Sequence, residues 1–211
     1  MNEQLIFQIN QAATPEDAIT AITAITVMDA PEIDAIKAVI TALSHHHPKV
    51  RNAAVEALVK LGNVTVKPLI AAYEASGDQG LQAHIIQALA QIGSSEALDL
   101  LTEVVGTTVA NHCQGNVRRI AARGLGNIAV NSHDAEIMSR VQEKLTWALV
   151  SPEDWGLRYA AAVSLQAIAT PATQAALQTA IATEADNVVR SRMALALGSG
   201  KTNKLPMTYD L

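Results

Sequence analysis

The sequence predicts an all-α protein folded as a right-handed α-solenoid of about five helical hairpins. Hydrophobic residues make up 49% of the 211 residues, yet only 3% are aromatic and 38 are alanine. Strands favour β-branched and aromatic side chains, so this composition favours helices that pack through small residues. A column of arginine or glutamine also recurs at positions 51, 82, 118, 158 and 190, with spacings of 31, 36, 40 and 32 residues. Each spacing has room for two helices and two turns.

The repeating unit combines a branched apolar residue, an Arg directly after it, and a Leu seven positions after the Arg. It reads Val50-Arg51 with Leu58, Val117-Arg118 with Leu125, Leu157-Arg158 with Leu165 and Val189-Arg190 with Leu197, and a variant reads Leu81-Gln82 with Leu89. A small residue stands six positions after the Arg column in every unit: Ala57, Ala88, Gly124, Ser164 and Ala196. We expect this small column to let neighbouring helices approach closely.

The hairpins follow one another along the chain. First helices are predicted over 32–43, 66–75, 96–110, 136–149 and 173–183, and each second helix is expected to begin near the Arg column. A starting helix is expected after Thr14, because Pro15 suits a first helical turn. Loops are predicted over 45–48, 76–79, 111–116, 131–134, 151–154 and 184–187. Residues 1–199 are expected to form a single solenoid domain, followed by a loose tail over 200–211.

Charge and cysteine content narrow the functional class. The net charge is −5 and the isoelectric point is about 5.6, which excludes a protein built to coat nucleic acid. No apolar run approaches the roughly 20 residues of a membrane span. The N-terminus lacks the positive region and apolar core of a signal peptide. Cys113 is the one cysteine, so an internal disulfide is excluded, and we expect a cytoplasmic protein.

The residue four positions before the Arg column varies among the units. It is His47, Asp78, Gln114, Asp154 or Asp186. An Asp at this position suits two structural roles, the N-cap of the second helix and an ion pair with an Arg of a neighbouring unit.

The third unit departs from the repeat with Asn111-His112-Cys113-Gln114-Gly115-Asn116, and the two longest spacings flank this unit. Insertions in solenoids gather in loops on one face, often the working face. We expect Cys113 just before a helix that starts near Val117, where the helix N-terminus and nearby arginines favour a thiolate. His112 titrates near neutrality. A plain loop with a partly buried thiol is the alternative interpretation of the same residues.

Other candidate ligand-binding residues surround this motif. Arg118 and Arg119 suit a ligand carboxylate, or ion pairs on the helix surface or between repeats. In the equivalent loop of the next unit, Asp154 is a candidate acceptor, Trp155 and Tyr159 are candidate stacking residues, and Arg158 accompanies them; packing against the adjacent helix is the alternative. His45-His46-His47 is interpreted as a solvated loop, because three consecutive imidazoles do not converge easily on one ion, and no metal site is expected.

The unit length and the Val-Arg…Ala…Leu pattern resemble HEAT-like repeats, specifically those of phycobilisome lyases, over roughly residues 31–199. Residues 111–116 are similar to the signature of the F-type subunit of the phycoviolobilin lyase-isomerase. The resemblance implies an E-type partner subunit, attachment of phycocyanobilin to a cysteine of the phycoerythrocyanin α chain, and isomerisation to phycoviolobilin. It implies that His112 and Cys113 serve isomerisation. Asn111, Gln114 and Asn116 are then candidate bilin contacts, and the bilin is a substrate, with no cofactor expected.

Two other functions are compatible with these repeats. One is an F-type subunit of a non-isomerising phycocyanobilin lyase, or a chaperone that holds the chromophore. The other is a HEAT-repeat scaffold that binds only proteins. The spectrum of the product separates the isomerase from the plain lyase, and bilin binding separates both from the scaffold.

Overall fold

The computed structural model describes residues 2–28, 31–108, 112–151 and 154–198, and within these ranges the chain is helical without strands. The helices are α1 (Asn2–Asn10), α2 (Pro15–Ile25), α3 (Ile33–Ala42), α4 (Pro48–Leu61), α5 (Val66–Ala75), α6 (Gln79–Ile92), α7 (Leu98–Gly106), α8 (His112–Asn131), α9 (Ala135–Leu149), α10 (Trp155–Ile168), α11 (Pro171–Ile181) and α12 (Asn187–Gly198). Short 3-10 helices, η1 (Gly62–Thr65) and η2 (Ser95–Ala97), precede α5 and α7. The predicted all-α class of helical hairpins is confirmed.

The chain separates into two compact units, Met1–Leu101 and Thr102–Leu211, and α7 crosses the boundary between them. The expected single solenoid over residues 1–199 stays a prediction, and the expected tail over 200–211 lies outside the described residues. No helix in the described ranges combines the length and the apolar character that a membrane crossing requires.

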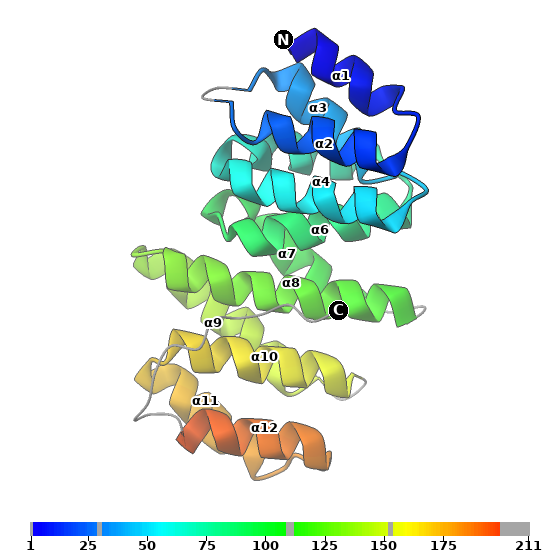
Figure 1. The fold of residues 1–211 in the computed structure, drawn as a ribbon. Helices are drawn as coiled ribbons and strands as arrows, with labels where there is room; N and C mark the ends of the chain where they lie inside the picture. Colours follow the sequence, from blue (N-terminus) through cyan, green and yellow to red (C-terminus); the bar gives the residue numbers. More distant parts are fainter. Residues whose placement is uncertain (1, 29–30, 109–111, 152–153, 199–211) are drawn as a thin grey trace. The chain divides into compact units, whose positions relative to one another are not determined.

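In the first unit, α2, α4 and α6 pack on one another in sequence order, while α1, α3 and α5 form the accompanying layer (Figure 1). Fully buried side chains from both layers fill the core, among them Ile22, Leu43, Leu58, Leu69 and Ile86. The structure adds a hairpin, α1 with α2, that the Arg column does not mark. The predicted start of α2 is confirmed, because Thr14 caps the helix in a capping box with Asp17 and Pro15 occupies the first turn.

In the second unit, α10 packs between α8 and α12, and α9 and α11 form the accompanying layer (Figure 1). Leu125 and Ile128 of α8 and Leu145 of α9 are fully buried in its core. The expected role of the small column is confirmed, since all five of its residues are buried: Ala57, Ala88, Gly124, Ser164 and Ala196.

Helices α8 and α10 approach each other closely where Gly126 faces Ser164. A Cβ at position 126 would lie 2.7 Å from both Cβ and Oγ of Ser164 and 3.1 Å from its Cα. The Ser164 hydroxyl donates a 3.0 Å hydrogen bond to the Ala122 carbonyl on the facing helix. Small residues therefore bring the two helices that carry the candidate site into direct backbone proximity.

Gly126→Ala is expected to lower the free energy of unfolding by about 1–3 kcal/mol, because the added methyl group forces the backbones of α8 and α10 apart. Thermal and urea unfolding measure the change. Gly198→Ala is the matched control, because nothing lies within 4 Å of a Cβ built there. Equal stability of Gly126→Ala and the control would show that the close approach is not needed.

Candidate functional site

Helix α8 begins earlier in its unit than the other second helices. It starts at His112, six residues before Arg118, whereas α4, α6, α10 and α12 start three residues before their own column residue. The expected loop over 111–116 and helix start near Val117 are therefore wrong for residues 112–116. Asp78, Asp154 and Asp186 end their loops as N-caps, and Pro48 occupies the first turn of α4. Gln114 is a poor N-cap and no proline follows it, so the helix continues upstream.

The His-Cys pair thus occupies the first turn of a long helix. The N-terminal end of a helix attracts negative charge through its dipole. Asn111 and the side chains of His112 and Cys113 lie outside the described residues.

Arg119 joins this part of α8 to the start of α10. Its NH2 lies 2.8 Å from Oδ1 of Asp154, its Nε lies 3.2 Å from the same oxygen, and its NH1 donates a 3.2 Å bond to Oδ1 of Asn116. Asp154 is nearly buried, and its Oδ1 also accepts the backbone N–H groups of Gly156 and Leu157. Both roles predicted for an Asp at this position, N-cap and ion pair with a neighbouring unit, are confirmed for Asp154.

The room for the Arg119 guanidinium comes from a glycine. A Cβ at Gly156 would clash with Nε and Cζ of Arg119. The Cζ atom lies 5.6 Å from the ring centroid of Trp155, a cation–π distance, and Trp155 remains 51% exposed. Oδ2 of Asp154 accepts a 3.4 Å bond from the Nε of Arg119. The cluster of Asn116, Arg119, Asp154 and Trp155 is called the α8–α10 clamp below.

Asp154→Asn is expected to keep the helix cap but lose the ion pair, and therefore to lower the free energy of unfolding by about 1 kcal/mol or less. Asp154→Ala removes both roles and is expected to cost about 2 kcal/mol or more, because the N–H groups of Gly156 and Leu157 lose their acceptor. Urea unfolding of the two variants measures the difference. Equal losses in both variants would assign the role of Asp154 to the ion pair alone.

The Arg column has a structural role that the sequence pattern did not reveal. In each of the five repeats, the side chain of the column residue donates a hydrogen bond to a backbone carbonyl in the preceding helix end or turn. The bonds run from Arg51 to His45 and His46, from Gln82 to Tyr73 and Ser76, from Arg118 to Val105, from Arg158 to Ser151 and from Arg190 to Glu184. Gln82 was the sign of this role in the sequence, because glutamine keeps an N–H donor at a position where the other repeats have a charged arginine. Arg118 is 5% exposed, so the structure gives it a place inside the hairpin.

Arg158 also forms a buried ion pair with the loop before α12. Its Nε lies 2.7 Å from Oε2 of Glu184, and its NH2 donates a 3.0 Å bond to Oε1. The side chains are 13% and 4% exposed. The hydrogen bonds from Arg158 hold the pKa of Glu184 below its usual value, and the same bonds raise the pKa of Arg158. Among the predicted bilin contacts, Arg158 is thus the one most fully occupied by the protein.

The depressed pKa of Glu184 makes stability depend on pH. Because its pKa is lower in the folded chain than in the unfolded chain, the pair stabilises fully above the unfolded pKa of about 4.3, and this stabilisation is lost as the pH falls through the folded pKa. The difference in free energy of unfolding between the wild type and Glu184→Gln is expected to shrink in that acid range. Urea unfolding across pH measures it, with the exposed Glu143→Gln as control. A difference that stays constant with pH would contradict this assignment.

Tyr159 lies one helical turn after Trp155, but the two side chains have different neighbouring helices. Tyr159 lines a groove between α10 and α12, while Trp155 contacts Arg119 of α8. The structure therefore brings together Asn116, Arg119, Asp154 and Trp155 from the predicted set, and it places Arg158 and Tyr159 on the side of α12. Gln114 is half-buried within α8.

The three consecutive histidines take part in the turn before α4. The Nδ1 atom of His45 accepts the backbone N–H of His47, and burial lowers the pKa of His45. Within the part of the chain that the structure describes, no three side chains of the metal-binding types come together.

Stacked helical hairpins with a small-residue column, and with an arginine or glutamine that bonds the turn before each second helix, are the architecture of a HEAT-repeat protein. The HEAT-repeat family model matches residues 2–75, 66–135 and 107–198. The bilin biosynthesis protein PecF of Nostoc sp. strain PCC 7120 is 69% identical over 165 residues, which cover 78% of this chain and 95% of that protein. The PecF of Mastigocladus laminosus is 59% identical over 198 residues, covering 93% of each chain. The chain belongs to the PecF family of bilin biosynthesis proteins.

More distant relatives extend the likeness to lyase subunits. A protein named phycocyanobilin lyase subunit beta, from the same Nostoc strain, is 31% identical over 204 residues, covering 93% of this chain and 98% of that protein. A solved structure of the complex of CpcE and CpcF of phycocyanin lyase, also from Nostoc, matches with a TM-score of 0.67 and 30% identity, covering 78% of this chain and 99% of the matched chain.

Proposed function

We propose that this chain is the F-type subunit of a heterodimeric bilin lyase-isomerase, which attaches phycocyanobilin to a cysteine of the phycoerythrocyanin α chain and isomerises it to phycoviolobilin. The observation that carries the proposal is the 69% identity to a PecF protein over a segment that includes nearly all of that protein. The E-type partner is supported by the CpcE–CpcF complex, in which the structural relative occurs. We place the reaction in the cytoplasm, with the bilin as substrate and no added cofactor.

The isomerisation step needs a proton delivered to one carbon and another removed from a nearby carbon, with no net gain or loss of electrons. A single imidazole serves as acid and then as base, which is the role we assign to His112. The Cys113 thiolate adds to the conjugated system, makes the neighbouring proton mobile, and leaves again as the shifted double bond forms. Sulfur and protons are therefore restored at the end of the cycle.

The α8–α10 clamp supports this chemistry by fixing the start of α8. Asn116 is part of the motif itself, and Arg119 holds it against Asp154, the N-cap of α10. Trp155 adds a half-exposed indole beside the guanidinium, which is a surface suited to stacking on a planar tetrapyrrole ring. The clamp thus orients the helix end that carries His112 and Cys113 and offers the bilin one stacking surface.

The direct test combines this chain, its E-type partner, phycocyanobilin and the apo-α chain of phycoerythrocyanin. The expected product has the blue-shifted absorption of phycoviolobilin, because isomerisation removes one ring from conjugation. An unshifted phycocyanobilin adduct would instead assign the chain to a non-isomerising lyase. Absence of bilin binding with the partner present would assign it to the protein-binding scaffolds. The reaction without the E-type partner serves as the control for the heterodimer requirement.

A further inference from the structure

A surface groove of about 460 Å³ runs between α10 and α12. Tyr159 lines it from α10, and the other lining residues come from α12: Asn187, Val188, Ser191, Arg192 and Leu195. Val188 and Leu195 are 56% and 58% exposed and are therefore accessible to a ligand. The groove therefore offers apolar walls and a cationic side chain to the same ligand.

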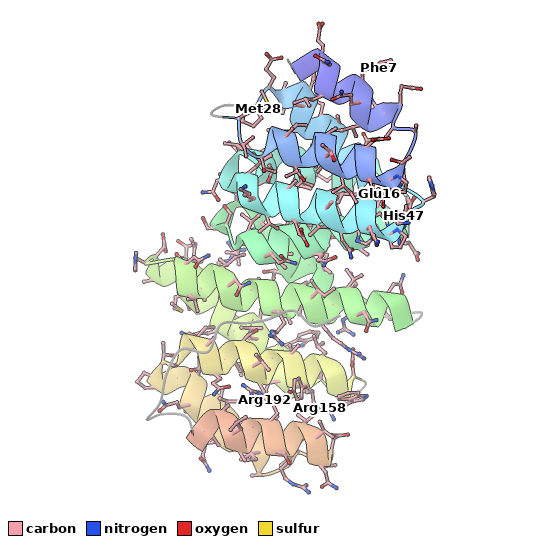
Figure 2. The ribbon with its side chains drawn as sticks, in the orientation of Figure 1. Phe7, Glu16, Met28, His47, Arg158 and Arg192 are labelled. Carbon is pink, nitrogen blue, oxygen red and sulfur yellow. The ribbon has the colours of Figure 1, made fainter. Side chains whose placement is uncertain are left out.

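Arg192 differs from the other arginines of this helix pair. Arg158 is bound to Glu184, and Arg190 donates to the Glu184 carbonyl, but the Nε of Arg192 is buried without a hydrogen-bond partner. Within the described residues Arg192 forms no ion pair. Figure 2 shows Arg158 and Arg192 between α10 and α12. Of these two cations, only Arg158 has a carboxylate partner among the described residues.

The guanidinium of Arg123, on α8, also contributes positive charge near Arg192. Burial lowers the pKa of Arg192, the electrostatic interaction with Tyr159 opposes this shift, and the charge of Arg123 on α8 lowers the pKa further. An arginine with a phenolic hydroxyl beside it presents donors that match the two oxygens of a carboxylate.

We propose that the α10–α12 groove binds a carboxylate borne on a flat apolar ligand, with Arg192 and Tyr159 as its donors and Val188 and Leu195 as its apolar contacts. Given the proposed function, on which this step rests, the carboxylate is one propionate of the bilin. A linear tetrapyrrole carries two propionates on an apolar ring system, so it supplies both chemical features. The open groove takes one propionate and the adjoining ring, and the remainder of the bilin lies beyond it.

The test titrates phycocyanobilin, and separately its dimethyl ester, into the complex of this chain with its E-type partner and follows absorbance. Arg192→Leu is expected to raise the Kd for the free acid about tenfold or more, because a charge-assisted bond is lost. The ester is expected to bind the wild type with a similarly raised Kd, and Arg192→Leu is expected to leave its Kd nearly unchanged. Arg140→Leu, an exposed arginine on α9, is the matched control, and Arg192→Lys is expected to restore part of the affinity.

The outcomes separate this inference from the proposed function. If the wild-type complex forms phycoviolobilin but Arg192→Leu binds acid and ester as the wild type does, the groove proposal is overturned and the proposed function stands. If Arg192→Leu instead loses the E-type partner on size exclusion with bilin affinity unchanged, the groove contacts protein and the proposal is again overturned. Equal affinity of the wild type for acid and ester overturns it without any variant. A wild-type complex that neither binds nor isomerises the bilin overturns both.

Discussion

Replacing Cys113 by serine is expected to slow the formation of phycoviolobilin by about 100-fold or more in the reconstituted complex, because a hydroxyl is a far weaker nucleophile than a thiolate. His112→Gln is expected to cause a loss of similar size, since the amide keeps a hydrogen-bonding group but cannot carry a proton between two carbons. The measurement is the rate at which the blue-shifted absorption appears with excess bilin and partner.

Two comparisons sharpen this experiment. Cys113→Ala and Cys113→Ser with equally low rates indicate a nucleophile, whereas a serine variant close to the wild-type rate indicates a group that only orients the bilin. Far-ultraviolet circular dichroism of each variant checks that α8 is retained, and size exclusion checks that the partner still binds. A wild-type rate of phycoviolobilin formation in either His112→Gln or Cys113→Ser would remove that residue from the mechanism.

Arg158→Met is expected to lower the free energy of unfolding by about 3–5 kcal/mol, the largest stability loss expected in the second unit. Methionine keeps much of the side-chain volume but leaves Glu184, whose side chain is 4% exposed, without its cation. The Ser151 carbonyl also loses a donor. Urea unfolding with a common m-value measures the change.

The double variant Arg158→Met with Glu184→Gln separates the lost ion pair from the lost packing. Removing the stranded charge is expected to recover about 2 kcal/mol or more of the loss, because an unpaired buried carboxylate is the main cost. Lys37→Met is the control, since Lys37 pairs with Asp34 on an exposed surface and is expected to change stability by less than about 1 kcal/mol. A double variant no more stable than Arg158→Met would show that packing and the turn bond dominate.

Local patterns carried much of the prediction. The spacing of the Arg column predicted the order of the hairpins, because amphipathic periodicity is a property of adjacent turns. The small column predicted the close faces of the helices, and Thr14 with Pro15 marked the start of α2. The departure at residues 111–116 was also visible as a break in this regularity. The one local error, the late start expected for α8, came from taking the Gly and Asn of the motif as a loop.

The sequence predicted which residues belong to the candidate site but not how they pair. Arg119, Asp154 and Trp155 were each named as candidates, but the sequence left open which cation would meet which carboxylate. The repeat pattern allowed Asp154 to pair with either Arg119 or Arg158. In the structure Asp154 pairs with Arg119, 35 residues away, and Arg158 pairs with Glu184, 26 residues away. Glu184 carried no signal, since a loop glutamate before a helix is ordinary. Arg192 carried none either, because the burial of its Nε without a partner among the described residues depends on how the helices pack.

The sequence by itself determined that the chain is a row of helical hairpins and where the unusual His-Cys motif interrupts the row. Both follow from contacts within one or two turns, which periodicity encodes directly. The packing of the helices, in contrast, set the pairing of Arg119 with Asp154 and of Arg158 with Glu184, and it formed the groove in which Arg192 has no carboxylate partner among the described residues. Those depend on the register in which one hairpin packs on the next, and that register is set by the summed fit of the small residues at their interface, such as Gly126 against Ser164.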